Sequence, residues 1–221
     1  MSEPTVDVIG VVVIDDHKMV AEVLGRMLAE DAGIDLLGVA SSGGEGIELV
    51  DRLRPQVVLV DYQMPDQDGV SVTAEIKRRH PETIVVMLTG SIDDRILLAA
   101  IDAGCSGFLT KDRAALDVVA AVHGAAAGEA LVSPALLARL LPKLNKSYRA
   151  VGADLTPRER ELLELVARGW TNKVIASELK LSVNTVRNYV QSVLTKLSAH
   201  SKLEAVATAV REGLIDYPST G

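Results

Sequence analysis

Four short apolar runs in the first half of the chain each end on polar residues that are suited to chemistry. The runs span residues 11–14, 57–60, 84–88 and 107–109, and they are followed by Asp15-Asp16, Asp61, Thr89 and Thr110-Lys111. Short uninterrupted apolar runs are typical of strands that are covered on both faces, as in a parallel sheet. Because open parallel sheets bind ligands beyond the carboxyl ends of their strands, we expect these polar residues to share one site.

The segments between these runs have the apolar spacing of amphipathic helices. The expected strands are 8–14, 34–40, 57–60, 84–88 and 107–109, and the expected helices lie within 19–28, 43–53, 70–79, 96–101 and 116–122. Five strands that alternate with five helices predict an α/β domain with a parallel sheet and helices on both faces. A flavodoxin-like strand order, 2-1-3-4-5, places the first and third strands side by side and brings Asp15, Asp16 and Asp61 together.

Acidic and basic residues are distributed unevenly along the 221 residues. Residues 1–130 hold 22 Asp and Glu against 10 Lys and Arg, whereas residues 131–221 hold 8 against 13, within a net charge of −7. This asymmetry predicts two modules, of which the second meets a polyanion such as nucleic acid. The expected organisation is a first domain at 1–128, a partly helical linker at 129–153 and a second domain at 154–221.

The sequence predicts a cytoplasmic protein that does not enter a membrane. No apolar run approaches the ~20 residues that a membrane-spanning helix requires, and the N-terminus lacks the basic and apolar regions of a signal peptide. Cys105 is the single cysteine, so the chain forms no internal disulfide. A lone cysteine fits a reducing compartment.

The three carboxylates expected at the sheet edge repel one another, by about 4 kcal/mol per pair at ~4 Å and an effective dielectric of ~20. A divalent cation removes this cost, and an all-oxygen site with open positions favours Mg²⁺ or Mn²⁺ over Zn²⁺. The expected ligands are Asp15, Asp16, Asp61 and the backbone carbonyl oxygen of Gln63. With the metal in place, the Asp61 carboxylate can attack a phosphoryl group, while Lys111 and Thr89 contact its oxygens.

This set of residues resembles the receiver domain of bacterial two-component response regulators. The resemblance covers about residues 7–127 and rests on Asp15-Asp16, Asp61 with Met64-Pro65 and Gly69, Thr89 and Lys111. It implies that Asp61 is the phosphoacceptor, that Asp15 and Asp16 bind Mg²⁺, and that Thr89 and Lys111 sense the phosphate. It also implies a switch role for Phe108, for which an ordinary core role is the alternative.

A phosphatase with an aspartyl nucleophile is another class that uses such acids. Many of these enzymes place a second aspartate two residues after the first, where this chain has Gln63. We therefore expect a protein that accepts one phosphoryl group and not an enzyme. His17, next to Asp16, is interpreted as a loop or helix-capping residue rather than a metal ligand.

The last 68 residues carry start signals for four helices and no strand pattern. Thr156–Glu159, with Pro157 at the first helical position, and Ser201–Glu204 have the spacing of capping boxes, and Thr171 and Ser182 are suitable N-caps. The tight connection at 180–182 predicts a helix-turn-helix within an all-α, four-helix domain.

The helix expected at 183–197 has one apolar and one polar stripe. The apolar stripe is Val186, Val190, Val193, Leu194 and Leu197, and the polar stripe is Asn184, Arg187, Asn188, Gln191 and Thr195. Amide and guanidinium groups read base edges in the major groove. A merely solvated face, which is the alternative, more usually mixes Lys with Glu.

This segment resembles the LuxR-type output domain over about residues 153–215. The resemblance rests on Glu159, Gly169, Thr171-Asn172-Lys173, Ile175-Ala176, Thr185-Val186, Lys196-Leu197 and Glu204-Ala205. It implies DNA contacts from Lys173, Asn184, Thr185, Arg187, Asn188, Gln191, Lys196 and Lys202, with Arg168 as a further phosphate contact. Of these, Arg187, Asn188 and Gln191 are the base-reading candidates.

In this order, the two resemblances make the chain similar to NarL/FixJ-type response regulators. They imply a transcription regulator that a sensor histidine kinase phosphorylates on Asp61 and that binds double-stranded DNA, with a homodimer expected. The alternative is an orphan regulator that binds DNA while its first domain works without phosphorylation.

Overall fold

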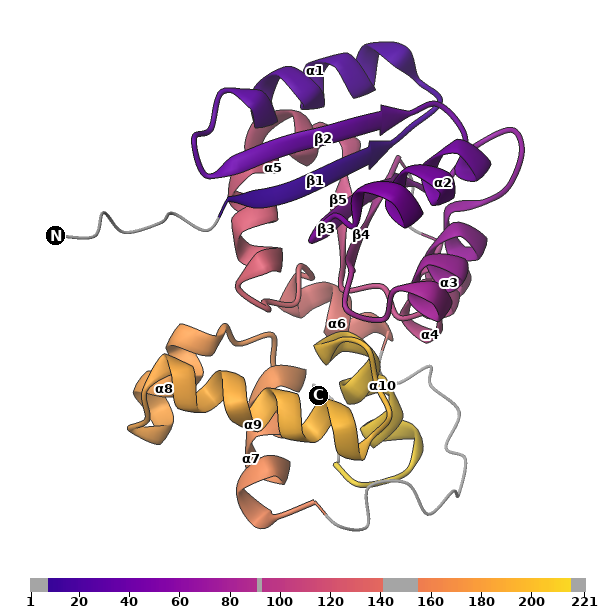
Figure 1. The fold of residues 1–221 in the computed structure, drawn as a ribbon. Coiled ribbons are helices and arrows are strands. Elements are labelled where there is room, and N and C mark those ends of the chain that lie inside the picture. Colours follow the sequence, from indigo (N-terminus) through magenta and orange to yellow (C-terminus); the bar gives the residue numbers. More distant parts are fainter. Residues whose placement is uncertain (1–7, 91–92, 141–154, 216–221) are drawn as a thin grey trace, which may run out of the picture. The chain divides into compact units, whose positions relative to one another are not determined.

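The computed structural model describes residues 8–90, 93–140 and 155–215 (Figure 1). These residues form two compact units. The first unit contains residues 8–90 and 108–127, and the second contains residues 93–107, 128–140 and 155–215. Most of the polar part of the expected linker, residues 141–153, lies outside the described residues.

The first unit is built on a parallel sheet. Its strands are β1 (Ile9–Ile14), β2 (Ile34–Ala40), β3 (Val57–Asp61), β4 (Ile84–Thr89) and β5 (Gly107–Thr110). They lie in the order β2-β1-β3-β4-β5, which confirms the predicted flavodoxin-like arrangement. In this register Ile14 is opposite Val60, and Asp61 is opposite Leu88. The residues that follow β1 therefore lie beside the end of β3.

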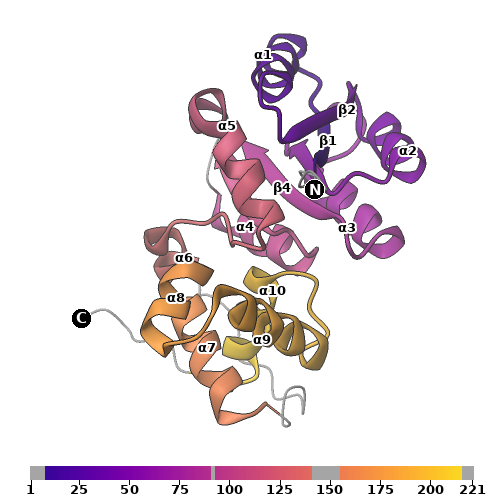
Figure 2. The same ribbon diagram turned by 60° about the vertical axis from the view of Figure 1, so that its left-hand side comes forward.

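Helices cover both faces of the sheet (Figure 2). The helices of this unit are α1 (Lys18–Ala29), α2 (Gly43–Leu53), α3 (Gly69–Arg79) and α5 (Lys111–Ala126). Helices α1 and α5 pack together on one face, and α2 and α3 pack together on the other. The backbone of α5 departs from helical geometry at Asp117, where φ is −151°.

The sheet is buried between these layers, as its uninterrupted apolar runs predict. Val12, Ile14, Val58, Val60 and Val85 have no exposed surface and pack with residues of α2 and α3. Burying one such side chain stabilises the fold by about 1.5–3 kcal/mol. This rigid core holds the strand ends, and with them the polar residues, in fixed positions.

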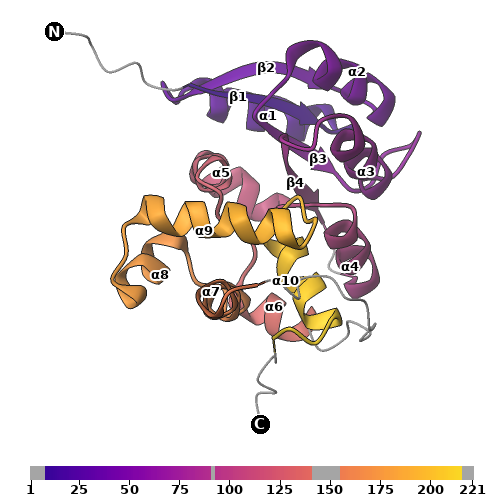
Figure 3. The ribbon, with the colours of Figure 1, turned by 60° about the horizontal axis from the view of Figure 1, so that its bottom comes forward.

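The second unit is helical apart from the start of β5. Its helices are α4 (Asp94–Asp102), α6 (Pro134–Leu140), α7 (Pro157–Ala167), α8 (Asn172–Leu179), α9 (Val183–Lys196) and α10 (Lys202–Arg211). Helices α8 and α9 are joined by the predicted short connection (Figure 3), in which Lys180 has the left-handed φ of 53°. Helix α10 packs on α4, α7 and α9.

All four residues predicted to begin the C-terminal helices are N-caps, but at one of the helices the predicted capping box is incomplete. Thr156 and Glu159 form a complete capping box, and Thr171 and Ser182 are N-caps. At α10 only half of the predicted box forms, because the Glu204 carboxylate accepts the backbone N–H of His200 at 2.6 Å instead of that of Ser201. In the described part of the chain, no helix is long and apolar enough to cross a membrane.

Candidate functional site

The predicted acidic residues converge at the carboxyl edge of the sheet. Asp15 directly follows β1 and Asp61 ends β3, so the pairing of these strands brings both carboxylates to one place. Their residues are 1% and 2% exposed. Thr89 ends β4 and is also buried, one residue beyond the partner of Asp61 in the sheet. Strand pairing therefore places these three residues at one edge of the sheet.

Lys111, the first residue of α5, brings a positive charge to these acids. Its Nζ lies 2.8 Å from Asp61 Oδ2 and 2.9 Å from Asp15 Oδ2. Burial favours the neutral amine, but the hydrogen bonds from Nζ to Asp61 and Asp15 outweigh this and raise the pKa of Lys111. The ammonium form is thus the one present at neutral pH, and it faces the position of the predicted phosphoacceptor.

Burial is the dominant influence on the phosphoacceptor candidate itself. It raises the pKa of the Asp61 carboxyl, and the neighbouring Asp15 charge adds to this, against the lowering effect of the hydrogen bond from Lys111. Asp61 thus lies with little solvation between the Lys111 amine and a second acid, Asp15. A cation bound nearby would stabilise the ionised form of Asp61 in this environment.

The donor atoms present fit a divalent metal ion. Among the described residues, one group of His, Cys, Asp and Glu side chains could hold a metal, and it consists of Asp15, Asp16, His17 and Asp61. Asp15 Oδ2 and Asp16 Oδ1 are buried and accept no well-aligned hydrogen bond from the described residues, although Lys111 Nζ lies 2.9 Å from the first and His17 Nδ1 lies 3.0 Å from the second. Buried carboxylate oxygens that lack well-aligned hydrogen bonds are costly, and a hard cation would satisfy them.

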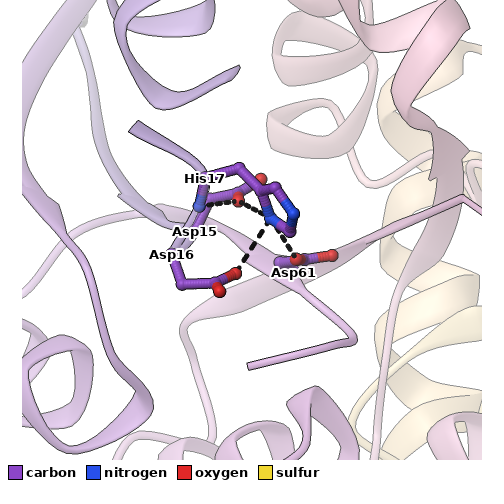
Figure 4. Close-up of side chains that lie close together, drawn as sticks. All are labelled: Asp15, Asp16, His17 and Asp61. Carbon is purple, nitrogen blue, oxygen red and sulfur yellow. Dashed lines mark hydrogen bonds and ion pairs between the residues drawn. The ribbon is translucent and has the colours of Figure 1, made fainter. Parts of the chain in front are cut away.

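The structure adds His17 to this group, a position that was not predicted from the sequence. It is the N-cap residue of α1, as its interpretation as a capping residue requires, but its side chain makes no capping hydrogen bond. The ring instead points toward the carboxylates of Asp15, Asp16 and Asp61 (Figure 4). One sequence feature could have indicated this position of the ring: His17 directly follows two acids, at a place where Ser, Thr, Asp or Asn is the usual cap.

The loop after β3 is fastened to the first turn of α2. The Asp66 carboxylate accepts the backbone N–H groups of Gly43 and Gly44 at 3.1 and 3.0 Å. These bonds, chiefly the one from Gly44, lower the pKa of Asp66. The loop residues Gln63 and Met64 line an open depression together with Asp16 and His17. Gln63, whose carbonyl was predicted as a ligand, is therefore adjacent to the acidic group.

Phe108, the predicted switch residue, lies in β5 and is half-buried. The residue is thus neither fully buried in the core nor fully exposed to solvent. Both interpretations of this side chain, as a switch and as a packing residue, are compatible with that position.

The polar stripe of α9 is on the surface, as predicted. Asn184, Arg187, Asn188, Gln191 and Thr195 are exposed, whereas Val186, Val193 and Leu197 are buried and Val190 and Leu194 are half-buried. Thr185 is half-buried, and its hydroxyl group is 2.8 Å from that of Ser182. Lys173, at the start of α8, is exposed. Helix α9 thus presents amide and guanidinium groups to the outside on a well-packed support.

Two of the predicted phosphate contacts are engaged inside the second unit. Lys196 Nζ lies 2.8 Å from the buried Glu159 carboxylate. Burial favours the neutral acid, but the hydrogen bonds from Lys196, Ser192 and Thr156 prevail and lower the pKa of Glu159 to about 2. The Glu159 carboxyl group is therefore ionised at neutral pH.

Lys202 is held in a similar way. Its residue is 7% exposed, and its Nζ donates to Asn172 Oδ1 at 2.7 Å and contacts the Glu129 carboxylate at 3.4 Å. Glu129 also accepts the backbone N–H of Asn172 at 3.0 Å. Burial lowers the pKa of Lys202, although Glu129 opposes this. Lys202 is buried and Lys196 is half-buried, so Arg168, Lys173 and Arg187 are the exposed cations among the predicted DNA contacts.

Comparison with known protein families matches both halves of the chain. Residues 11–123 match the response regulator receiver domain, and residues 153–209 match the bacterial regulatory proteins of the luxR family. The chain belongs to the response regulator family. It combines a receiver domain with a LuxR-type DNA-binding domain, as the sequence predicted.

Individual relatives agree with this membership. The response regulator protein VraR of Staphylococcus aureus is 34% identical over 207 residues, which cover 94% of this chain and 99% of VraR. A structure of the RcsB response regulator of Salmonella typhimurium has a TM-score of 0.55 and 26% identity, covering 90% of this chain and 97% of that one. The receiver domain of the putative response regulator NarL from Mycobacterium tuberculosis has a TM-score of 0.53 and 32% identity, covering 56% and 99%.

Proposed function

We propose that Asp61 accepts a phosphoryl group from a sensor histidine kinase and that this reaction controls how the response regulator binds double-stranded DNA. The observation that carries the proposal is the buried contact of Lys111 with both Asp61 and Asp15. A buried carboxylate beside a fixed ammonium group and a second acid has the parts that phosphoryl transfer requires.

The proposed reaction is a simple displacement at phosphorus. An Asp61 carboxylate oxygen forms a bond to phosphorus while the bond from phosphorus to the kinase imidazole breaks, and the departing imidazole takes up a proton. Lys111 holds a phosphoryl oxygen by charge, and the Thr89 hydroxyl group donates to another. Mg²⁺ or Mn²⁺, held by Asp15, Asp16, Asp61 and the Gln63 carbonyl oxygen, supplies neutralising charge when bound. The chain acts once per phosphoryl group and is not an enzyme.

The phosphoryl group changes the charge at the carboxyl edge of the sheet. An ordinary phosphate ester carries about −1.5 to −2 at neutral pH. We infer that this charge draws in Thr89 and alters the surroundings of Phe108. A shift from mostly inactive to mostly active protein requires a differential stabilisation of several kcal/mol, about 5.5 kcal/mol for a complete reversal of a 1:99 population.

We propose that α9 reads base edges, with Arg187, Asn188 and Gln191 as the reading side chains and Lys173 as a phosphate contact. A homodimer in the cytoplasm would place two such helices on half-sites about one helical turn apart. Lys196 and Lys202 reach phosphates only when their pairs with Glu159 and Glu129 open.

The proposal is tested by loading the protein with acetyl phosphate and Mg²⁺ and measuring its affinity for DNA. The duplex is selected from a random library with the wild-type protein, and binding is followed by fluorescence anisotropy at fixed salt. We expect the phosphorylated protein to bind the selected duplex with a different affinity from the unmodified protein. Equal affinity of the two forms, with phosphorylation verified by intact mass, contradicts phosphorylation control.

Substituting Arg187→Ala should weaken binding to the selected duplex more than binding to a scrambled duplex. A bidentate base contact contributes about 1–3 kcal/mol of discrimination, so we expect a loss of roughly 5- to 150-fold on the selected duplex alone. Arg113→Ala is the matched control, because Arg113 is an exposed arginine in the first unit. Equal losses on both duplexes would assign Arg187 to the phosphate backbone instead of the bases.

A further inference from the structure

His17 has a geometry that a capping residue or a surface residue does not require. Its backbone N–H donates to Asp15 Oδ1 at 2.8 Å, which fixes the turn between β1 and α1. Its ring Nδ1 lies 3.0 Å from Asp16 Oδ1, 3.3 Å from Asp15 Oδ1 and 3.7 Å from Asp61 Oδ2. One ring nitrogen therefore faces carboxylates from two different strands (Figure 4).

These separations are close to those of neighbouring ligand atoms around one metal ion. Metal–ligand bonds of about 2.0–2.2 Å place adjacent ligands of an octahedron roughly 2.8–3.1 Å apart. The ligand atoms of Asp15, Asp16, His17 and Asp61 all lie within 4.8 Å of one another. The His17 ring therefore needs only a small adjustment to share an ion with the carboxylates.

The charges of the group also suit a divalent ion. Three carboxylates and the ammonium group of Lys111, which lies 3.5 Å from the His17 Nδ1, leave a formal charge of −2. A neutral imidazole adds a ligand without changing this balance. In addition, the buried oxygens Asp15 Oδ2 and Asp16 Oδ1 accept no well-aligned hydrogen bond from the described residues, although Lys111 Nζ lies close to the first and His17 Nδ1 to the second.

We propose that His17 is a nitrogen ligand of the metal site and that it shifts the preference of this site from Mg²⁺ toward first-row transition ions such as Mn²⁺ and Co²⁺. Imidazole is a good ligand for Zn²⁺, Cu²⁺, Fe²⁺ and Ni²⁺, whereas Mg²⁺ prefers oxygen. Within a fixed ligand set, affinity rises from Mn²⁺ to Co²⁺. This inference rests on the proposed metal-binding role of the acidic group and adds the class of ion that it selects.

The test compares metal affinities of untagged full-length wild type and His17→Ala, using Mg²⁺ and Co²⁺ separately in isothermal titration calorimetry. Because even second-shell partners of metal ligands contribute 10- to 100-fold to affinity, we expect His17→Ala to lose roughly tenfold or more for Co²⁺. The Mg²⁺ affinity should change by less than about twofold, since Mg²⁺ gains little from a nitrogen ligand. His17 is an exposed side chain, so folding is expected to be intact and is checked by circular dichroism.

The matched control is His200→Ala, which removes another exposed histidine that contacts a carboxylate, Glu204 at 3.3 Å. It should leave the Co²⁺ affinity of the acidic group unchanged. As a direct readout, pulsed electron paramagnetic resonance of bound Mn²⁺ should detect a coupled ¹⁴N nucleus in wild type and in His200→Ala but not in His17→Ala.

Equal Co²⁺ affinities of wild type and His17→Ala, or a Mn²⁺ spectrum without nitrogen coupling in wild type, overturn the proposal. A failure of the His17 ligand role can be distinguished from a failure of the proposed phosphorylation of Asp61. If wild type takes up no phosphoryl group but the nitrogen coupling is present, the metal ligand stands and phosphorylation fails. If wild type is phosphorylated and the coupling is absent, the ligand role of His17 fails alone.

Discussion

Asp61→Asn is expected to abolish phosphorylation while leaving the fold intact. In wild type, incubation with Mg²⁺ and acetyl phosphate should add one phosphoryl group, and in the variant it should add none. The amide lacks the nucleophilic carboxylate oxygen but has nearly the same shape, and its carbonyl oxygen can still accept from Lys111, whose Nζ lies 2.8 Å from Asp61 Oδ2. The measurement is the intact mass of both proteins before and after incubation.

The same substitution should affect stability in a metal-dependent way. Asp61 and Asp15 are buried like charges, so removing one of them relieves repulsion, and without metal the variant should melt at a temperature at least as high as wild type. Added Mg²⁺ should raise the melting temperature of wild type more than that of the variant, because a ligand that binds only the folded state stabilises it.

A matched control separates the role of Asp61 from a general loss of acidity. Asp35→Asn removes an exposed carboxylate of β2 and should be phosphorylated like wild type. A phosphoryl group on Asp61→Asn would show that another residue is the acceptor. If wild type gains none from acetyl phosphate, the experiment is repeated with purified histidine kinases, and failure with these as well refutes the phosphoacceptor role.

Gly69→Ala should disturb the site through the backbone. A Cβ atom at Gly69 would lie 2.4 Å from the backbone oxygen of Asp61 and 2.9 Å from the Cα of Tyr62. Gly69 also donates its N–H to the Tyr62 carbonyl oxygen at 2.8 Å. The methyl group therefore forces α3 and the end of β3 apart. Overpacking of this kind costs about 1–3 kcal/mol, and we expect a lower melting temperature together with slower phosphorylation.

Gly44→Ala provides the comparison, because it adds the same methyl group within α2. There the nearest atom is Asp66 Oδ2, at 3.8 Å. Since alanine is a better helix former than glycine by roughly 1 kcal/mol, this variant should be as stable as wild type or slightly more so. Thermal unfolding followed by circular dichroism and intact mass after acetyl phosphate measure both effects. A Gly69→Ala protein with wild-type stability and phosphorylation would contradict the close backbone contact.

The position of Asp61 was predictable because local pattern and strand pairing act together. An apolar run of four residues ends at this acid, and a buried parallel strand presents its last residue at the carboxyl edge. The order 2-1-3-4-5 was an inference from the convergence of acids, and the structure confirms it. The polar stripe of α9 was predictable for a related reason, since apolar residues at helical spacing determine which face of the helix is buried.

Pairings between distant charges were decided only by tertiary structure. Lys202 opens α10, where a lysine is usually exposed, yet Glu129 and Asn172 bury its amine. These partners are 73 and 30 residues away in the chain. Periodicity carries no information about which residue from another element will lie opposite a given side chain. The phosphate role predicted for Lys202 therefore stays a prediction that requires this pair to open.

The chain alone determined the two domain types, the sheet edge that holds the acids and the helix face that carries the amides, because these follow from apolar periodicity and short-range signals. Tertiary structure decided which partners the side chains at these positions contact. His17 follows two acids and directly precedes α1, and sequence favours a cap at that place. Its ring turns instead to the carboxylates of Asp15, which follows β1, and of Asp61, which ends β3, because the field of clustered charges forms only after the strands have paired.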